Sequence, residues 1–143
     1  MRTRLRNERG AALLETAITV PIILLISVGI FEFGRAYQVQ QVLTNAAREG
    51  ARVAVIEGTA DSDVTKVVTD YMKNGNLLID QNNPPTIAVS RNEAFGGTTG
   101  SKVTVTFPYE FMVIGGVAKL VSPTSTVGSE TLKLQASALM RNE

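Results

Sequence analysis

The sequence predicts an α+β protein in which a long N-terminal helix, transmembrane in its first half, packs with a short helix under a small three-stranded antiparallel sheet. An apolar run of membrane length, residues 11–31, contains a single acid, Glu15, near its start. A helical pattern continues beyond that run, and the rest of the chain holds one amphipathic helical segment and three alternating runs. We therefore expect three regions: a basic leader at 1–10, the long helix at 11–56, and a domain outside the membrane at 57–143.

The leader carries most of the charge asymmetry of the chain. Residues 1–10 hold four Arg and one Glu, a net charge of +3, whereas the remainder holds 10 basic and 12 acidic residues, a net charge of −2. A basic segment before an apolar run places the N-terminus in the cytoplasm. We expect a single-pass protein of the inner (cytoplasmic) membrane with its C-terminal domain outside.

The apolar run is long enough to span a membrane only if Glu15 is included. Sixteen residues are uninterrupted from Thr16 to Phe31, and counting back to Ala11 gives 21, against about 20 for a span. A secretory signal peptide would end at a small-residue cleavage site, but here the helical pattern continues. A retained helix is therefore favoured over a signal peptide. Pro21 frees the carbonyl of Ala17, so we expect a bend or local unwinding there.

A stripe of small residues follows in the second half of this helix. Ala46, Gly50 and Ala54 recur every four residues, a spacing that lets helix backbones approach closely. Two interpretations remain open for this helix-packing stripe. It packs under the sheet of its own chain, or part of it packs against neighbouring copies.

The C-terminal region alternates between loop signals and short elements. Apolar positions at helical spacing predict a short helix at residues 64–72. Three runs with period-two alternation predict the strands, and Asn92–Gly100 is expected to join the first two as a hairpin. The predicted strands are Thr86–Ser90, Lys102–Phe107 and Leu132–Met140. Since a sheet needs a second layer to bury its apolar face, the long helix is the natural partner.

Two segments are candidates for partner contact. Phe111–Val121, which includes Met112 and Ile114, is unusually apolar for a connection, and would mark a contact site if it were exposed. The alternative is that it folds over one end of the sheet as core. Phe95, a lone aromatic in the hairpin, is a modest indication of adhesion.

Composition argues against several functions. The chain has no cysteine and no histidine, which removes disulfides, thiolate nucleophiles, imidazole acid–base catalysis and the commonest zinc ligands. It has no nucleophile elbow or phosphate-binding glycine loop, and its acids lack calcium-loop spacing. We expect no enzyme, cofactor or metal. A mildly acidic body with few aromatics gives no reason to expect nucleic acid as a partner.

The N-terminal residues carry a resemblance to a known family. It rests on the Arg9-Gly10 junction, Glu15, Pro21, and two segments, FEFGR at 31–35 and NAAREGAR at 45–52. Together these resemble the TadE-like family, pilin-related proteins of tight-adherence (Flp, type IVc) pilus systems. The C-terminal SALMRNE fits the closing strand of that family more loosely. The resemblance implies a type IV pilin-like fold, and a role as a minor pilin or assembly initiator that reaches an extracellular pilus.

The resemblance also implies how the N-terminus is used. A prepilin peptidase on the cytoplasmic face would cut at Arg9-Gly10-Ala11, after Gly10, and make Glu15 the fifth residue. The new α-amine and Glu15 of an adjacent subunit would then be opposite charges in an apolar setting, which suits subunit registration. The implied partners are other pilin-like subunits, the peptidase, the tight-adherence inner-membrane assembly machinery, and membrane lipid before assembly. The alternative is an uncleaved single-span anchor that presents its outer domain to a partner.

Overall fold

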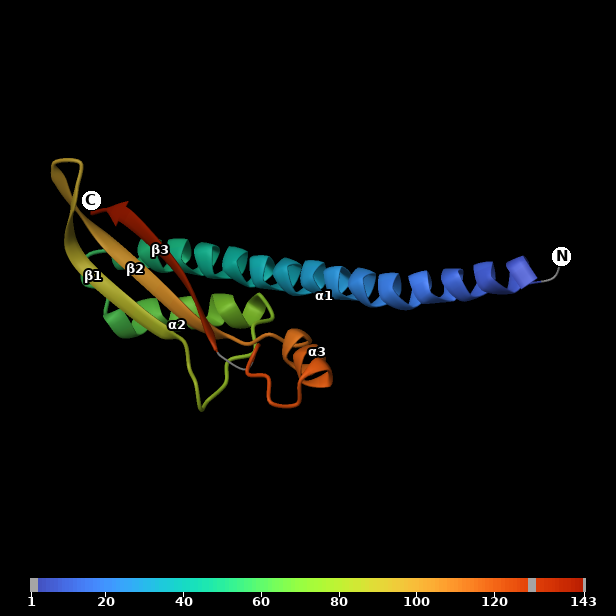
Figure 1. Cartoon of the computed structure of the whole chain (residues 1–143). Helices are drawn as coiled ribbons and strands as arrows, with labels where there is room; N and C mark the ends of the chain where they lie inside the picture. Colours follow the sequence, from blue (N-terminus) through green and yellow to red (C-terminus); the bar gives the residue numbers. More distant parts are fainter. Residues whose placement is uncertain (1–2, 129–130, 143) are drawn as a thin grey trace.

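A single helix, α1, extends through most of the length of the molecule and carries the remaining elements at its C-terminal end (Figure 1). The structure, a computed structural model, describes residues 3–128 and 131–142. Its elements in chain order are α1 (Thr3–Ala54), α2 (Asp61–Asn74), β1 (Thr86–Phe95), β2 (Thr98–Tyr109), α3 (Ile114–Val121) and β3 (Leu132–Arg141). The predicted α+β arrangement, a long apolar helix with a short helix and a three-stranded antiparallel sheet, is confirmed.

Helix α1 is continuous over 52 residues, about 78 Å at 1.5 Å per residue. It begins at Thr3, within the segment expected to be a separate leader, and ends at Ala54. Pro21 lies inside the helix without interrupting it, so the local unwinding expected there is absent. The axis bends gently in its N-terminal half (Figure 1).

The sheet has the order β1-β2-β3, with both pairs antiparallel. The central strand aligns Val103 with Val89 on one side and with Ala138 on the other. The hairpin between β1 and β2 is tighter than the sequence indicated, because both strands extend into the region predicted as turn. Only Gly96 and Gly97 remain between them, with positive φ values of 54° and 84° that glycine adopts without strain.

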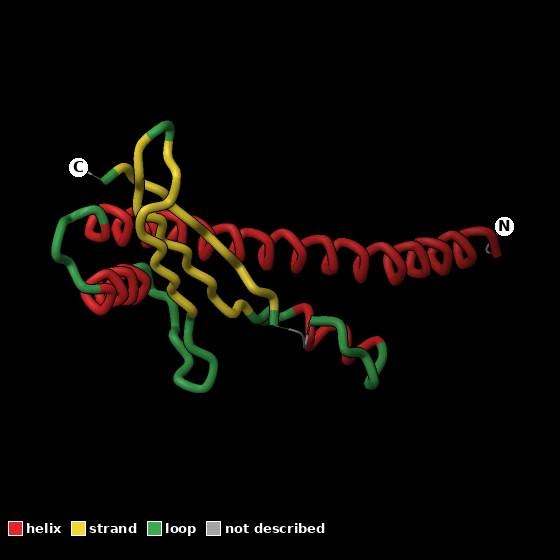
Figure 2. The backbone as a smooth tube through the Cα atoms, turned by 90° about the vertical axis from the view of Figure 1, so that its left-hand side faces the viewer, coloured by secondary structure: helices red, strands yellow, loops and turns green. Residues whose placement is uncertain are grey.

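The core lies between one face of the sheet and the C-terminal half of α1, with α2 beside it (Figure 2). Alternate residues of β2 are buried, as a strand with one covered face requires. The sheet contributes the core residues Val103, Val105, Phe107, Tyr109 and Ala136. Helix α1 contributes Val39, Leu43, Ala46, Ala47, Ala51 and Ala54, and α2 contributes Val64, Val68 and Met72.

The small-residue stripe of α1 is part of this core. Ala46 is 0% exposed and Ala54 is 1% exposed. A Cβ at Gly50 would lie 2.5 Å from Cγ2 of Val68 and 3.3 Å from Cγ1 of Val103. The small side chains therefore let α1 approach α2 and the sheet of its own chain, and the stripe is not free to contact a neighbouring copy.

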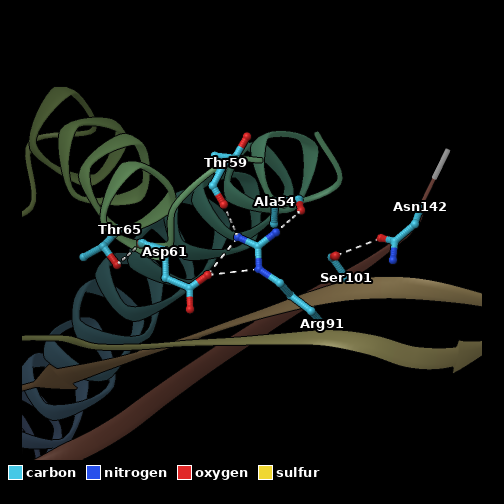
Figure 3. Close-up of polar contacts among 7 residues, drawn as sticks. All are labelled: Ala54, Thr59, Asp61, Thr65, Arg91, Ser101 and Asn142. Atoms are coloured by element: carbon cyan, nitrogen blue, oxygen red, sulfur yellow. Dashed lines mark hydrogen bonds and ion pairs between the residues drawn. The ribbon is translucent and has the colours of Figure 1, made fainter. Parts of the chain in front are cut away.

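Arg91 on β1 fastens the end of α1 to the start of α2 (Figure 3). Its Nη1 donates to the carbonyl oxygen of Ala54 at 2.8 Å, and its Nη2 donates to that of Thr59 at 2.8 Å. Its Nε and Nη2 also donate to one carboxylate oxygen of Asp61, at 3.1 and 2.8 Å. A cation at the C-terminal end of a helix satisfies a free carbonyl and complements the helix dipole. The long helix is thus held at its last turn.

Candidate assembly interface and membrane helix

Residues 11–27 of α1 form a mostly apolar surface that no other described part of the chain covers. Every residue from Ala11 to Ser27 is exposed. Gly10–Ala54 is long and apolar enough to cross a membrane, and its most apolar 18-residue window is 0% buried. Within residues 3–128 and 131–142, α1 is the one helix with these properties. Exposed apolar area on this scale marks a surface that meets lipid or other protein.

The predicted processing site lies in the regular part of α1. Gly10 and Ala11 are exposed, and a Cβ at Gly10 would meet no atom within 4 Å. The backbone of Arg9 is helical, and its side chain lies outside the described residues. Gly10 and Ala11 are therefore accessible to solvent.

Glu15, the predicted registration residue, lies one turn beyond Ala11 on the same face of α1. It is exposed, and in the described part of the chain it takes part in no hydrogen bond or ion pair. The hydroxyl of the next residue, Thr16, donates to the carbonyl oxygen of Ala12 at 2.8 Å. The Glu15 carboxylate is thus exposed and unpaired within the described residues.

Glu32 is the first fully buried residue after the apolar half, at 0% exposed. The backbone N–H groups of Val113 and Ile114 donate to its Oε1, the second at a distance of 3.3 Å. The hydroxyl of Tyr109 donates to its Oε2 at 3.5 Å. Val113 is the N-cap of α3 and has no capping hydrogen bond from its own side chain. The carboxylate of Glu32, although distant in sequence, therefore caps the N-terminus of α3.

Arg35, one turn further along, completes this junction. Its guanidinium carbon lies 5.3 Å from the centroid of the Tyr109 ring, and its Nη1 donates to the carbonyl oxygen of Glu110 at 3.4 Å. The rings of Tyr109 and Phe111 meet edge to face, with centroids 5.5 Å apart and an interplanar angle of 87°. These contacts bind the middle of α1 to the end of β2.

The pKa of the Tyr109 phenol is raised above its usual value, chiefly because burial disfavours the phenolate. Arg35 opposes this shift, whereas the Glu32 carboxylate adds to it. The neutral phenol remains available as a hydrogen-bond donor to Glu32.

The FEFGR segment therefore divides between two faces of α1. Glu32 and Arg35 face the domain, whereas Phe31 and Phe33 are 58% and 71% exposed. The role of Glu32 was not predicted from the sequence, in which this segment supported only the family resemblance. The available signal was a carboxylate and an arginine, three residues apart, at the end of a membrane-length run. Charged side chains at the end of a membrane-spanning run need a partner that offsets the cost of removing them from water.

A cleft of about 650 Å³ opens beside this junction, between the middle of α1, the connection from α2 to β1, and the end of β2. It is lined by both apolar and charged residues, including Ile30, Phe31, Arg35, Leu78, Asp80 and Glu110. Over the described ranges, no group of three or more carboxylates is placed to hold a metal ion.

The predicted partner-contact residues are only partly exposed. Met112 is 64% exposed, whereas Phe111 and Ile114 are half-buried. The segment expected to be a connection contains α3, a helix that the sequence analysis did not predict. Phe95 is the last residue of β1, and its side chain lies outside the described residues. The structure does not bring Phe95 and Met112 together, because the hairpin and α3 lie at opposite ends of the sheet (Figure 1).

Comparison with known protein families matches residues 10–52 to TadE-like protein. The matched segment begins at the predicted processing site and contains Glu15, Glu32 and Gly50. It thus covers both the apolar half of α1 and most of the half that packs under the sheet. No curated protein and no solved structure matches the chain. This chain therefore carries a TadE-like domain at residues 10–52, built on one long N-terminal apolar helix.

Proposed function

We propose that this protein is a pilin-like structural subunit, a minor pilin or assembly initiator, of a tight-adherence (Flp-type) pilus. One observation carries the proposal: the TadE-like domain coincides with a helix that is apolar and exposed in one half and packed under a folded domain in the other. Such a helix can exchange lipid for neighbouring helices without unfolding the domain. The role is structural rather than catalytic.

Processing begins the proposed sequence of events. The basic leader holds the N-terminus in the cytoplasm while the domain lies outside the cytoplasmic membrane. A prepilin peptidase then cuts between Gly10 and Ala11, which removes a net charge of +3. The cut also frees an α-amine with a pKa of about 7.7–8.0. Loss of the charged leader lowers the cost of extracting the helix from the bilayer.

Registration follows from the position of Glu15. Its exposed carboxylate lies four residues beyond the new α-amine, without a partner in the described part of the chain. In an assembled fibre the amine of one subunit pairs with Glu15 of the next, in apolar surroundings. Removing one member of such a buried pair costs about 3–5 kcal/mol, so misregistered subunits are disfavoured. The assembly machinery of the inner membrane and other pilin-like subunits complete the set of proposed partners.

Two substitutions test processing and registration separately. Gly10→Val is expected to block cleavage, because a β-branched residue crowds the scissile bond. Gly29→Val is its control, since Gly29 lies on the same half of α1 and its Cβ would also meet no atom within 4 Å. Glu15→Ala is expected to permit cleavage and to impair incorporation into sheared filaments, with Glu57→Ala as the exposed-acid control. Normal cleavage of Gly10→Val contradicts the processing site, and normal filament content of Glu15→Ala contradicts registration.

A second function, a permanent single-span anchor that presents the outer domain to a partner, is favoured by one observation. Helix α1 crosses Gly10 as regular helix from Thr3 onward, whereas a peptidase needs the scissile peptide in an accessible, unwound form. For this function the protein keeps its leader and is confined to the membrane fraction. The mass of the native protein therefore distinguishes the two functions, because only the permanent anchor retains residues 1–10.

A further inference from the structure

The segment from Phe111 to Gly128, here called the α3 segment, has an unusual composition for a surface connection. Its 18 residues include one charged residue, Lys119, and no acid. By contrast, the 14 residues of α2 include three acids and two lysines. Met112 and Val127 are 64% and 60% exposed. The α3 segment thus exposes the apolar side chains of Met112 and Val127 and the single cation, Lys119.

The attachment of the α3 segment to α1 determines how far this segment lies from the hydrocarbon core of a bilayer that surrounds α1. The 21 residues from Ala11 to Phe31 span about 31 Å at 1.5 Å per residue, which matches the roughly 30 Å hydrocarbon core of a bilayer. Glu32 is the next residue, and its carboxylate holds the first N–H groups of α3. The start of α3 therefore lies within about one helical turn of the hydrocarbon boundary.

The side of the sheet on which the α3 segment lies is consistent with a position close to the bilayer. In both views it lies on the side of the sheet from which the apolar half of α1 emerges (Figures 1 and 2). The hairpin between β1 and β2 lies at the far end of the sheet (Figure 1). A bilayer around residues 11–31 would therefore meet the α3 segment before any other part of the domain.

We propose that the α3 segment is a second membrane contact, which rests on the outer interface of the bilayer beside the transmembrane half of α1. Met112 and Val127 insert at the boundary between headgroups and acyl chains, and Lys119 extends its ammonium group to the lipid phosphates. Because the N–H groups of α3 are tied to Glu32, this contact limits how far the domain can tilt around α1. The inference rests on the proposed membrane insertion of α1, and its test separates the two.

Single-cysteine variants of the full chain provide the test, because the protein contains no cysteine of its own. Met112→Cys and Val127→Cys are labelled with a polarity-sensitive fluorophore and reconstituted in vesicles of phosphatidylcholine and phosphatidylglycerol. A fraction of the phosphatidylcholine carries a nitroxide quencher, placed either shallow or deep on its acyl chain. Ile23→Cys reports insertion of α1, and Thr65→Cys on the exposed face of α2 is the aqueous control.

The expected result is a blue shift and a loss of fluorescence at positions 112 and 127, greater with the shallow nitroxide than with the deep one. Ile23→Cys should lose more fluorescence to the deep nitroxide, and Thr65→Cys should lose none. If Ile23→Cys is quenched while positions 112 and 127 behave like Thr65→Cys, the inference is overturned and membrane insertion stands. A blue shift at 112 without lipid quenching also overturns it and indicates a second copy of the chain as the occupant. If Ile23→Cys is not quenched, insertion of α1 is refuted and the inference falls with it.

Discussion

Replacing Glu32 by alanine should detach α3 from α1 while leaving the sheet folded. The carboxylate is fully buried and accepts the N–H groups of Val113 and Ile114. Loss of an N-cap side chain costs about 0.5–2 kcal/mol, and a hydrogen bond to a charged group contributes about 1.5–3 kcal/mol. Because the two N–H donors are only part-buried, water can reach them once the carboxylate is gone. We therefore expect a local loss of about 2 kcal/mol, where these two ranges overlap.

Amide hydrogen exchange of the full chain in detergent micelles measures this loss locally. A loss of 2 kcal/mol corresponds to roughly thirtyfold faster exchange at Val113 and Ile114. Glu32→Gln retains an acceptor oxygen and loses the charge, so its effect should be about half as large in free energy. Glu57→Ala, which removes an exposed acid beyond α1, should leave these amides unchanged. The reasoning is refuted if Glu32→Ala leaves the protection of both amides at the wild-type level.

The remaining predictions concern the core, the junction tyrosine and the end of α1. Gly50→Ala should lower the free energy of unfolding by about 1 kcal/mol, because overpacking of about 1–3 kcal/mol exceeds the helix-propensity gain of about 1 kcal/mol. Gly34→Ala is the control, because a Cβ at Gly34 would meet no atom within 4 Å, and it should raise the free energy of unfolding by about 0.5–1 kcal/mol. Denaturant titration measures both variants, and a stabilising effect of Gly50→Ala would contradict the close packing at this position. The raised pKa of Tyr109 means that the folded chain keeps a proton that the unfolded chain loses, so stability is present below pH 10 and falls as pH rises through the folded pKa. Tyr109→Phe should flatten this alkaline decline and Tyr71→Phe should not, and equal declines in both would refute the assignment. Arg91→Lys should lower the melting temperature, since lysine keeps the charge but cannot reach two carbonyls and a carboxylate together. An unchanged melting temperature would show that the hydrogen bonds of Arg91 do not contribute to stability.

The sequence predicted those helices and strands whose hydrophobic periodicity can be seen within the element itself. The apolar run, the amphipathic segment that became α2, and the three alternating runs each carry their periodicity locally. The expected hairpin accounts for the pairing of β1 with β2, whereas the place of β3 beside β2 is known only from the structure. The small-residue stripe pointed to close helix packing, but choosing its partner required the positions of Val68 and Val103.

Helix α3 was missed because the group that caps it is remote in sequence. Val113 and Glu32 are 81 residues apart, and the segment itself offers two glycines and no capping side chain. Local propensity therefore favours a loop, and a tertiary contact reverses that preference.

Two boundaries were misplaced for local reasons. Residues 1–10 were expected to be a separate leader because of their charge and the cut after Gly10. However, no residue from Thr3 to Arg9 breaks a helix, and arginine and leucine favour one. The hairpin was drawn too wide because Gly96, Gly97 and Gly100 all resemble turn residues. Gly100 is in fact paired within the sheet, where a Cβ would lie 2.6 Å from the carbonyl oxygen of Met140. Its requirement for glycine is steric rather than conformational.

Intact mass and N-terminal peptide mapping of the native protein, taken from membranes and from sheared surface filaments, test the central proposal most directly. We predict a mature chain that begins at Ala11 and is present in the sheared fraction. A chain that retains the leader and is found only in membranes would contradict the pilin-like role and support the permanent anchor.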